Sequence, residues 1–159
     1  MPDYNLLAAQ AKAFADAERD YVPLLANVSA LLFESLERIN WAGFYLMDRG
    51  RLLLGPFQGK PACIRIEIGK GVCGTAVQTD QIQRVADVHQ FPGHIACDAA
   101  SASEIVVPIH SGGTIVGVLD IDSPEPDRFD QTDEDGLLKL VIQLEEAADF
   151  SRLRIKKGF

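Results

Sequence analysis

The sequence has no CxxC pair, although it contains three cysteines, Cys63, Cys73 and Cys97. Separations of ten and twenty-four residues exclude a zinc ribbon and a thioredoxin-type motif, because both need two cysteines close together in the sequence. An odd number of cysteines in a reducing compartment is most often a set of buried, inert thiols. The surroundings of each cysteine therefore decide whether it is reactive.

Long apolar runs are also missing, and none approaches the roughly 20 residues that a membrane-spanning helix needs. The N-terminal segment lacks the basic start, the unbroken apolar stretch and the cleavage site of a signal peptide. We therefore expect a cytoplasmic protein that does not cross a membrane.

Positive charge is scarce, with 15 lysines and arginines against 23 aspartates and glutamates and a net charge of −8. The acids are densest in residues 120–135, where Arg128 is the only basic residue. Such a surface repels phosphate backbones and anionic lipids. Binding of nucleic acid or of a membrane surface is therefore disfavoured as the function.

The length of 159 residues fits one domain with its own core, and no repeat, low-complexity tract or linker divides the chain. Apolar residues at helical spacing predict helices at residues 4–19, 22–39, 71–79 and 132–148. Thr132 and Asp135 resemble a capping box that opens the last of these helices. Alternating apolar residues and glycine turns predict two β-hairpins, at residues 41–57 and 104–122, and two shorter strands, at residues 64–68 and 83–88.

Each cysteine has a different local setting. Cys63 follows a proline on a connection between strands, where an accessible and movable thiol is expected. Cys73 lies in the first turn of the short central helix, among apolar neighbours that favour a small buried hydrophobe over a reactive thiolate. Cys97 lies in a long loop before the second hairpin, and loops of this length are often functional. Cys97 is therefore the candidate for chemistry.

The acids of the second hairpin depend on its register. If residues 112–113 form a two-residue turn, Glu104 points away from Asp120. If residues 111–113 form a three-residue loop, Glu104 opposes Asp120, and Asp122 joins them on the same face. The second register places three carboxylates together after the loop that carries the candidate cysteine.

Three neighbouring carboxylates repel one another unless a metal, shared protons or a cationic ligand relieves the repulsion. A metal is disfavoured, because no histidine lies at ligand spacing and these acids alone make a poor calcium cage. A ligand with an ammonium group fits better, and the alternative is a set of solvated acids at a sheet edge. Trp41 and Tyr45 share one face of the first hairpin strand, where they either fill a core or wall a small apolar pocket.

Several segments together resemble one family. They are WAGFYL, GKGVCGTA, VHQFPGHIACDAAS, SEIVVPI and VGVLDIDSP. These segments resemble the free methionine-(R)-sulfoxide reductases, and the order of the predicted elements resembles a GAF domain. The resemblance covers about residues 20–150 and implies that residues 1–159 form a single GAF domain of the α+β class. In that fold an antiparallel β-sheet is flanked by N- and C-terminal helices.

The resemblance also implies the reaction, which is reduction of free, not protein-bound, methionine-(R)-sulfoxide to methionine. It implies that Cys97 is the catalytic cysteine, Cys63 the resolving cysteine and Cys73 an auxiliary third cysteine. The substrate-binding residues implied by the same motifs are Glu104, Asp120, Asp122, Trp41 and Tyr45. No metal and no bound cofactor are expected.

The residue types support this chemistry. Reduction of a sulfoxide by a thiol needs a thiolate that attacks sulfur and an acid that protonates the departing oxygen. Cys97 is the nucleophile in this interpretation, and one of the crowded carboxyl groups keeps a proton at neutral pH. The sulfenic acid formed on Cys97 condenses with a second thiol, with Cys63 preferred to Cys73. By family resemblance, thioredoxin reduces the disulfide and draws on NADPH through thioredoxin reductase. His94 is expected to structure the loop.

Two other functions use the same fold or the same cysteines. A ligand-sensing GAF module would bind a cyclic nucleotide or another effector, but three acids oppose an anionic ligand. In a redox-sensor protein without turnover, the three carboxylates would have no function. A homodimer through the N-terminal helices is compatible with the apolar residues of those helices.

Overall fold

The computed structural model describes residues 2–93 and 100–156, so the predictions for Cys97 and His94 fall outside the described residues. The helices are α1 (Tyr4–Ala17), α2 (Tyr21–Ser35), α3 (Gly71–Thr79) and α4 (Gln131–Ala147), with a 3₁₀ turn, η1, at Val88–Gln90. The strands are β1 (Trp41–Asp48), β2 (Arg51–Gly59), β3 (Arg65–Ile66), β4 (Gln83–Val85), β5 (Ser103–Ser111) and β6 (Thr114–Ser123). None of the helices in this described part is long and apolar enough to cross a membrane.

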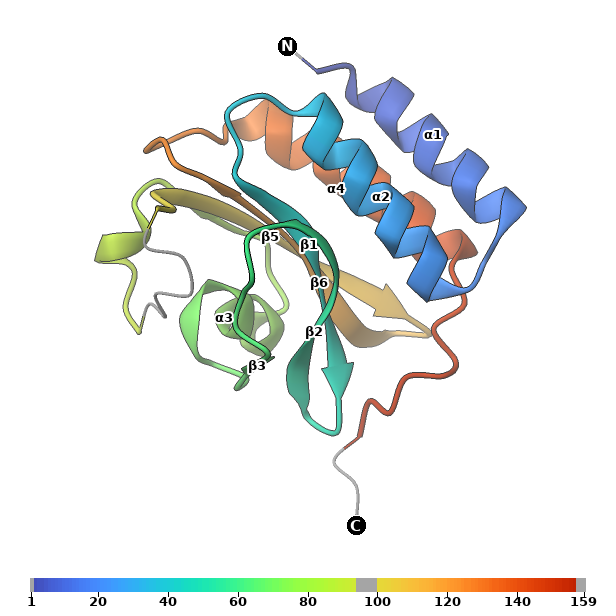
Figure 1. Ribbon diagram of the computed structural model, residues 1–159. Helices are drawn as coiled ribbons and strands as arrows, with labels where there is room; N and C mark the ends of the chain where they lie inside the picture. The colour runs from blue at the N-terminus through green and yellow to red at the C-terminus, as the bar shows by residue number, and fades with distance from the viewer. Residues whose placement is uncertain (1, 94–99, 157–159) are drawn as a thin grey trace.

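The strands form one sheet in the order β3-β2-β1-β6-β5-β4, and every neighbouring pair is antiparallel. Helices α1, α2 and α4 pack together on one side of this sheet, and α3 lies on the other side (Figure 1). The predicted α+β class, with an antiparallel sheet flanked by N- and C-terminal helices, is therefore confirmed.

Alternation along the strands divides the buried side chains between two cores, one on each face of the sheet. Phe44, Ile105 and Leu119 point toward α1, α2 and α4, where they join the larger core. Trp41 and Tyr45 point the opposite way, toward α3, and belong to the smaller core. The functional candidates of the first hairpin therefore lie on the α3 side.

Several predicted boundaries differ from the observed ones. Helix α2 ends at Ser35, because Leu36 already has an extended backbone. The capping box of α4 consists of Asp130 and Asp133, so the prediction of Thr132 and Asp135 was wrong by two residues. The strand predicted at residues 64–68 is reduced to the short β3.

The register of the β5–β6 hairpin differs from both predicted alternatives. Ser111 pairs with Thr114, which leaves Gly112 and Gly113 as a two-residue turn at positive φ. The pairing then shifts by one residue at a β-bulge between Ile109 and His110. Beyond the bulge the residue opposite Glu104 is therefore not the one that either predicted register gives.

After the bulge, Glu104 pairs with Asp122, and Val106 pairs with Asp120. The prediction that Glu104 directly opposes Asp120 was therefore wrong. Because residues two apart on a strand share a face, all three acids still lie on the same face of the sheet. The bulge thus restores the clustering that a simple two-residue turn would have prevented.

Candidate active site

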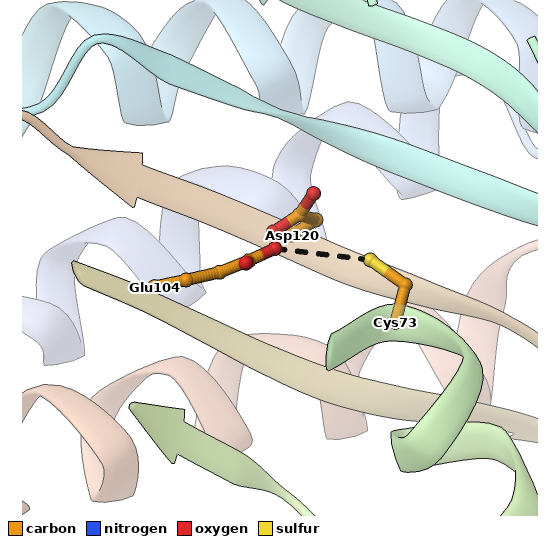
Figure 2. Close-up of side chains that lie close together, drawn as sticks. All are labelled: Cys73, Glu104 and Asp120. Atoms are coloured by element: carbon orange, nitrogen blue, oxygen red, sulfur yellow. Dashed lines mark hydrogen bonds between the residues drawn. The ribbon is translucent and has the colours of Figure 1, made fainter. Parts of the chain in front are cut away.

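Three side chains from three elements converge on the α3 face of the sheet. Glu104 comes from β5, Asp120 from β6 and Cys73 from the first turn of α3 (Figure 2). The Cys73 thiol lies 3.9 Å from Glu104 Oε2 and donates a hydrogen bond to it. Cys73, Glu104 and Asp120 are all buried, whereas Asp122, opposite Glu104, is half-buried.

Burial sets the protonation of this cluster. It raises the pKa of Glu104 well above its ordinary value, and the neighbouring Asp120 and Asp122 raise it further. Burial also raises the pKa of Asp120, although hydrogen bonding with Glu104 partly offsets this effect. Both shifts favour a carboxyl group that keeps its proton, which is what a general acid requires.

Burial likewise raises the pKa of the Cys73 thiol, and the carboxylates of Asp120 and Glu104 add to the effect. Its place in the first turn of α3 does not produce a reactive thiolate, because desolvation and negative neighbours outweigh the helix N-terminus. The prediction that Cys73 is a small buried side chain is confirmed. Its hydrogen bond to Glu104 was not predicted, because the sequence does not show which residue α3 faces.

Aromatic side chains from β1 stand beside the acids. Trp41 pairs with Asp122 across β1 and β6, and its ring stacks on those of Tyr45 and Phe57 at centroid distances of 5.9 Å and 5.1 Å. Trp41 and Tyr45 are both buried and both line a cavity, so each of the two predicted roles applies. Phe57, which extends this stack, was not predicted.

A narrow cavity of about 60 Å³ lies between this sheet face and α3. Its lining contains the acids Glu104, Asp120 and Asp122 together with apolar side chains that include Ile66 and Val72. A lining that combines acids with apolar side chains suits a small molecule that carries both an ammonium group and an apolar chain.

The polar ends of the two aromatics bind a segment that carries another candidate cysteine. Trp41 Nε1 donates a hydrogen bond to the Lys60 carbonyl oxygen at 3.1 Å. The Tyr45 hydroxyl donates one to the Cys63 carbonyl oxygen at 2.9 Å. These bonds tie the Cys63 segment to the cavity wall, a link that sequence alternation could not reveal.

The cysteines of the described residues differ in state. Cys63 is half-buried and disulfide-bonded, whereas Cys73 is a free, buried thiol. Cys63 also packs against the smaller core that contains Trp41 and Tyr45. The structure thus brings Cys73, Cys63, the three acids and the two aromatics to one region of the α3 face.

Comparison with known proteins places this arrangement in a family. The family model described as "GAF domain" matches residues 7–147. The "Free methionine-R-sulfoxide reductase" of Escherichia coli is 57% identical over 144 residues, which cover 91% of this chain and 83% of that protein. The chain belongs to the free methionine-R-sulfoxide reductase family.

Solved structures of this reductase family have the same fold. The reduced form of fRMsr of Staphylococcus aureus superposes with a TM-score of 0.90 at 54% identity, covering 94% of this chain and 97% of that one. The free methionine-R-sulfoxide reductase of Neisseria meningitidis, solved in complex with its substrate, has a TM-score of 0.87 at 44% identity, covering 91% and 87%. The resemblance noted in the sequence is therefore confirmed at the level of family and fold.

Proposed function

We propose that this protein reduces free L-methionine-(R)-sulfoxide to L-methionine. The observation that carries the proposal is the buried acid pair Glu104 and Asp120, which lines one small cavity together with the stacked aromatic rings of Trp41 and Tyr45. The names of the relatives and the family membership support it. A buried pair of acids has a raised pKa and therefore supplies the proton that sulfoxide reduction needs.

Substrate binding follows from the charges of the cavity. The α-ammonium of the free amino acid lies among Asp122 and the two buried acids and relieves their mutual repulsion. The methylsulfinyl chain lies against Trp41 and Tyr45. A peptide-linked methionine has no such ammonium, so the site selects the free amino acid.

The first half-reaction transfers oxygen from substrate to enzyme. The Cys97 thiolate attacks the sulfoxide sulfur, and a protonated carboxyl of the Glu104–Asp120 pair protonates the sulfoxide oxygen. The S–S bond formed by this attack and the substrate S–O bond then break as the hydroxyl moves to the Cys97 sulfur. Cys97 becomes a sulfenic acid, while the substrate sulfur gains two electrons and becomes the thioether of methionine.

The second half-reaction regenerates the thiol. The Cys63 thiol attacks the sulfur of the sulfenic acid, so that a disulfide forms and water leaves. The disulfide-bonded state of Cys63 supports it as the resolving cysteine, and the buried, protonated Cys73 is a poorer nucleophile. We propose thioredoxin as the external dithiol, with electrons from NADPH through thioredoxin reductase. We also propose a homodimer through α1 and α2, supported by the exposed apolar Leu6 and Val22.

The test is consumption of NADPH in the presence of thioredoxin and thioredoxin reductase. Free L-methionine-(R)-sulfoxide is compared with its (S) epimer and with its N-acetylated form. We expect turnover of the free (R) compound alone, because only it has both the required configuration and the ammonium. Turnover of the N-acetylated form would contradict the assignment of the acids, and no turnover of any compound would favour a ligand-sensing module.

A further inference from the structure

The cluster of Cys73, Glu104 and Asp120 has the composition and spacing of a metal site. One ligand atom from each residue, the Cys73 Sγ and a carboxylate oxygen of each acid, lies within 4.8 Å of the other two. The three side chains point toward one another from α3, β5 and β6 (Figure 2). All three are buried, so a bound ion would be shielded from water.

A second observation also indicates a missing ligand. Asp120 Oδ1 is buried and has no hydrogen-bond partner among the described residues. A buried carboxylate oxygen without a partner is costly, because it has lost its water and gained nothing in return. Asp120 lines the cavity, and a cation held there would satisfy this oxygen.

The distance between the Cys73 thiol and the Glu104 carboxylate suits zinc. Tetrahedral zinc with Zn–S of about 2.3 Å and Zn–O of about 2.0 Å places sulfur and oxygen roughly 3.5 Å apart. The observed distance between Cys73 Sγ and Glu104 Oε2 is 3.9 Å, so a side-chain adjustment of a few tenths of an ångström suffices. One thiolate with two carboxylates favours zinc over calcium or magnesium, which need more oxygen ligands.

We propose that Cys73, Glu104 and Asp120 bind a zinc ion, and that this ion and the substrate exclude each other. The exclusion rests on the proposed function, because it assumes that the substrate ammonium lies against the same acids. Zinc, bound by three protein ligands, keeps a fourth position open to the cavity. An enzyme loaded with zinc is therefore inactive until the ion is removed.

The sequence disfavoured a metal here, because no histidine lies at ligand spacing and the acids alone make a poor calcium cage. The fold adds a thiol from α3, which is 31 residues before Glu104 in the chain and comes to it only through tertiary packing. No local motif in the sequence therefore displays this set of three ligands.

The test uses cobalt(II) as a spectroscopic substitute for zinc in a full-length Cys63→Ser, Cys97→Ser variant, in which Cys73 is the only cysteine of the sequence. We expect a thiolate-to-cobalt charge-transfer band in the near ultraviolet and intense visible bands typical of tetrahedral coordination. Excess zinc should remove the charge-transfer band and the visible bands, since zinc and cobalt compete for the same site. No charge-transfer band at saturating cobalt would overturn the proposal.

Three further variants in that background, one of them a control, make the test specific to the proposed ligands. Cys73→Ser should abolish the charge-transfer band. Glu104→Gln should leave the wavelength of the band unchanged but weaken cobalt binding by about tenfold or more. Glu125→Gln, which changes an exposed acid of the same charge, is the matched control and should bind cobalt normally. A band that survives Cys73→Ser, or equal weakening by Glu125→Gln, would overturn the site.

Competition between the substrate and cobalt tests the mutual exclusion, and its failure can be told apart from a failure of the metal site. Free L-methionine-(R)-sulfoxide should displace cobalt in the double-serine variant, which binds the substrate but lacks the nucleophile. Persistence of the band at saturating substrate would overturn the mutual exclusion. The metal site itself is decided by the Cys73→Ser comparison, whether or not the protein turns over the sulfoxide.

Discussion

Tyr45 has two roles that its two ends perform separately. Its ring lines the cavity, and its hydroxyl donates a hydrogen bond to the Cys63 carbonyl oxygen. Burial raises the pKa of this hydroxyl, and nearby Asp120 raises it further, so it remains a donor at physiological pH. In the proposed mechanism the ring would therefore contact the substrate, and the hydroxyl would position Cys63, the proposed resolving cysteine.

Tyr45→Phe should separate these two roles, because it keeps the ring and removes the hydrogen bond. Formation of methionine in a single turnover should stay near the wild-type rate, whereas the following formation of the disulfide should slow by roughly fivefold, about 1 kcal/mol. Rapid quenching followed by quantification of methionine and of free thiols measures both steps. Equal rates of thiol loss in the two proteins would contradict the role of the hydroxyl.

Cys63→Ser should permit about one methionine per protein molecule and then stop, because the sulfenic acid on Cys97 forms but no resolving thiol follows. Cys73→Ser is the matched comparison and should still form the disulfide. Methionine yield without and with thioredoxin, together with a sulfenic-acid reagent, measures the outcome. Unchanged multiple turnover in Cys63→Ser would show that Cys73 or another thiol resolves the intermediate.

Asp122→Ala should lower kcat/KM for the free sulfoxide by about 10- to 100-fold, because an ammonium–carboxylate hydrogen bond contributes about 1.5–3 kcal/mol. Oxidation of the cysteines by hydrogen peroxide should remain as fast as in the wild type, since peroxide has no ammonium group. Steady-state kinetics and thiol titration give the two values. Loss of both would favour a general structural effect, and loss of neither would favour a redox sensor.

His110, near the end of β5, contacts residues from two different helical segments. One ring nitrogen lies 2.7 Å from Asp80, which follows the C-terminus of α3, and the other lies 2.8 Å from Glu145 of α4. Burial is the largest single influence and lowers the pKa of His110, but the hydrogen bonds to Asp80 and Glu145 and the charges of these acids together outweigh it, so the net pKa is raised. The protonated ring therefore links helices on opposite faces of the sheet through the β5 edge.

This link makes stability depend on pH in a defined direction. Because the folded pKa of His110 is above its unfolded value of about 6.5, its contribution is fully present below that pH and is lost as the pH rises through the folded value. His110→Gln should therefore cost more stability at about pH 5.5 than at about pH 8.5. Urea unfolding of both proteins at both pH values measures this, and an equal or reversed difference would contradict it.

For the molecule as a whole, the larger core and the candidate active site lie on opposite faces of the sheet. The larger core holds α1, α2 and α4 on one face, while the acids, Cys73 and the aromatics lie on the other. This separation lets the α3 face keep buried acids, which are unfavourable, because the apolar core behind the sheet stabilises the fold. Substitutions in that larger core should therefore change stability without changing catalysis.

Gly136→Ala tests this separation. A methyl group there would lie 2.1 Å from Tyr4 Cγ, so α1 would have to move away from α4. We expect destabilisation by about 1–3 kcal/mol, although alanine in an unobstructed helix would stabilise by about 1 kcal/mol. Urea unfolding measures the loss, and kcat/KM of the folded protein should not change. Most of the loss should disappear in a Tyr4→Ala background, and its persistence would contradict the steric explanation.

Sequence periodicity by itself determined the elements and the faces of their side chains. Helix α3 was predicted at its observed bounds, and Trp41 and Tyr45 share a face as expected. These features depend on repeats of 3.6 and 2 residues, which neighbouring residues specify locally. The recognisable motifs around the cysteines and acids added the family.

Only the tertiary structure decided which side chains meet. The bulge near His110 moved the partner of Glu104 to Asp122, because register depends on how whole strands pair rather than on alternation. The packing of α3 against β5 and β6 brought Cys73 to Glu104, and strand pairing placed Tyr45 under the Cys63 segment. Contacts between residues far apart in the chain arise from the sum of many packing interactions, which no local pattern records.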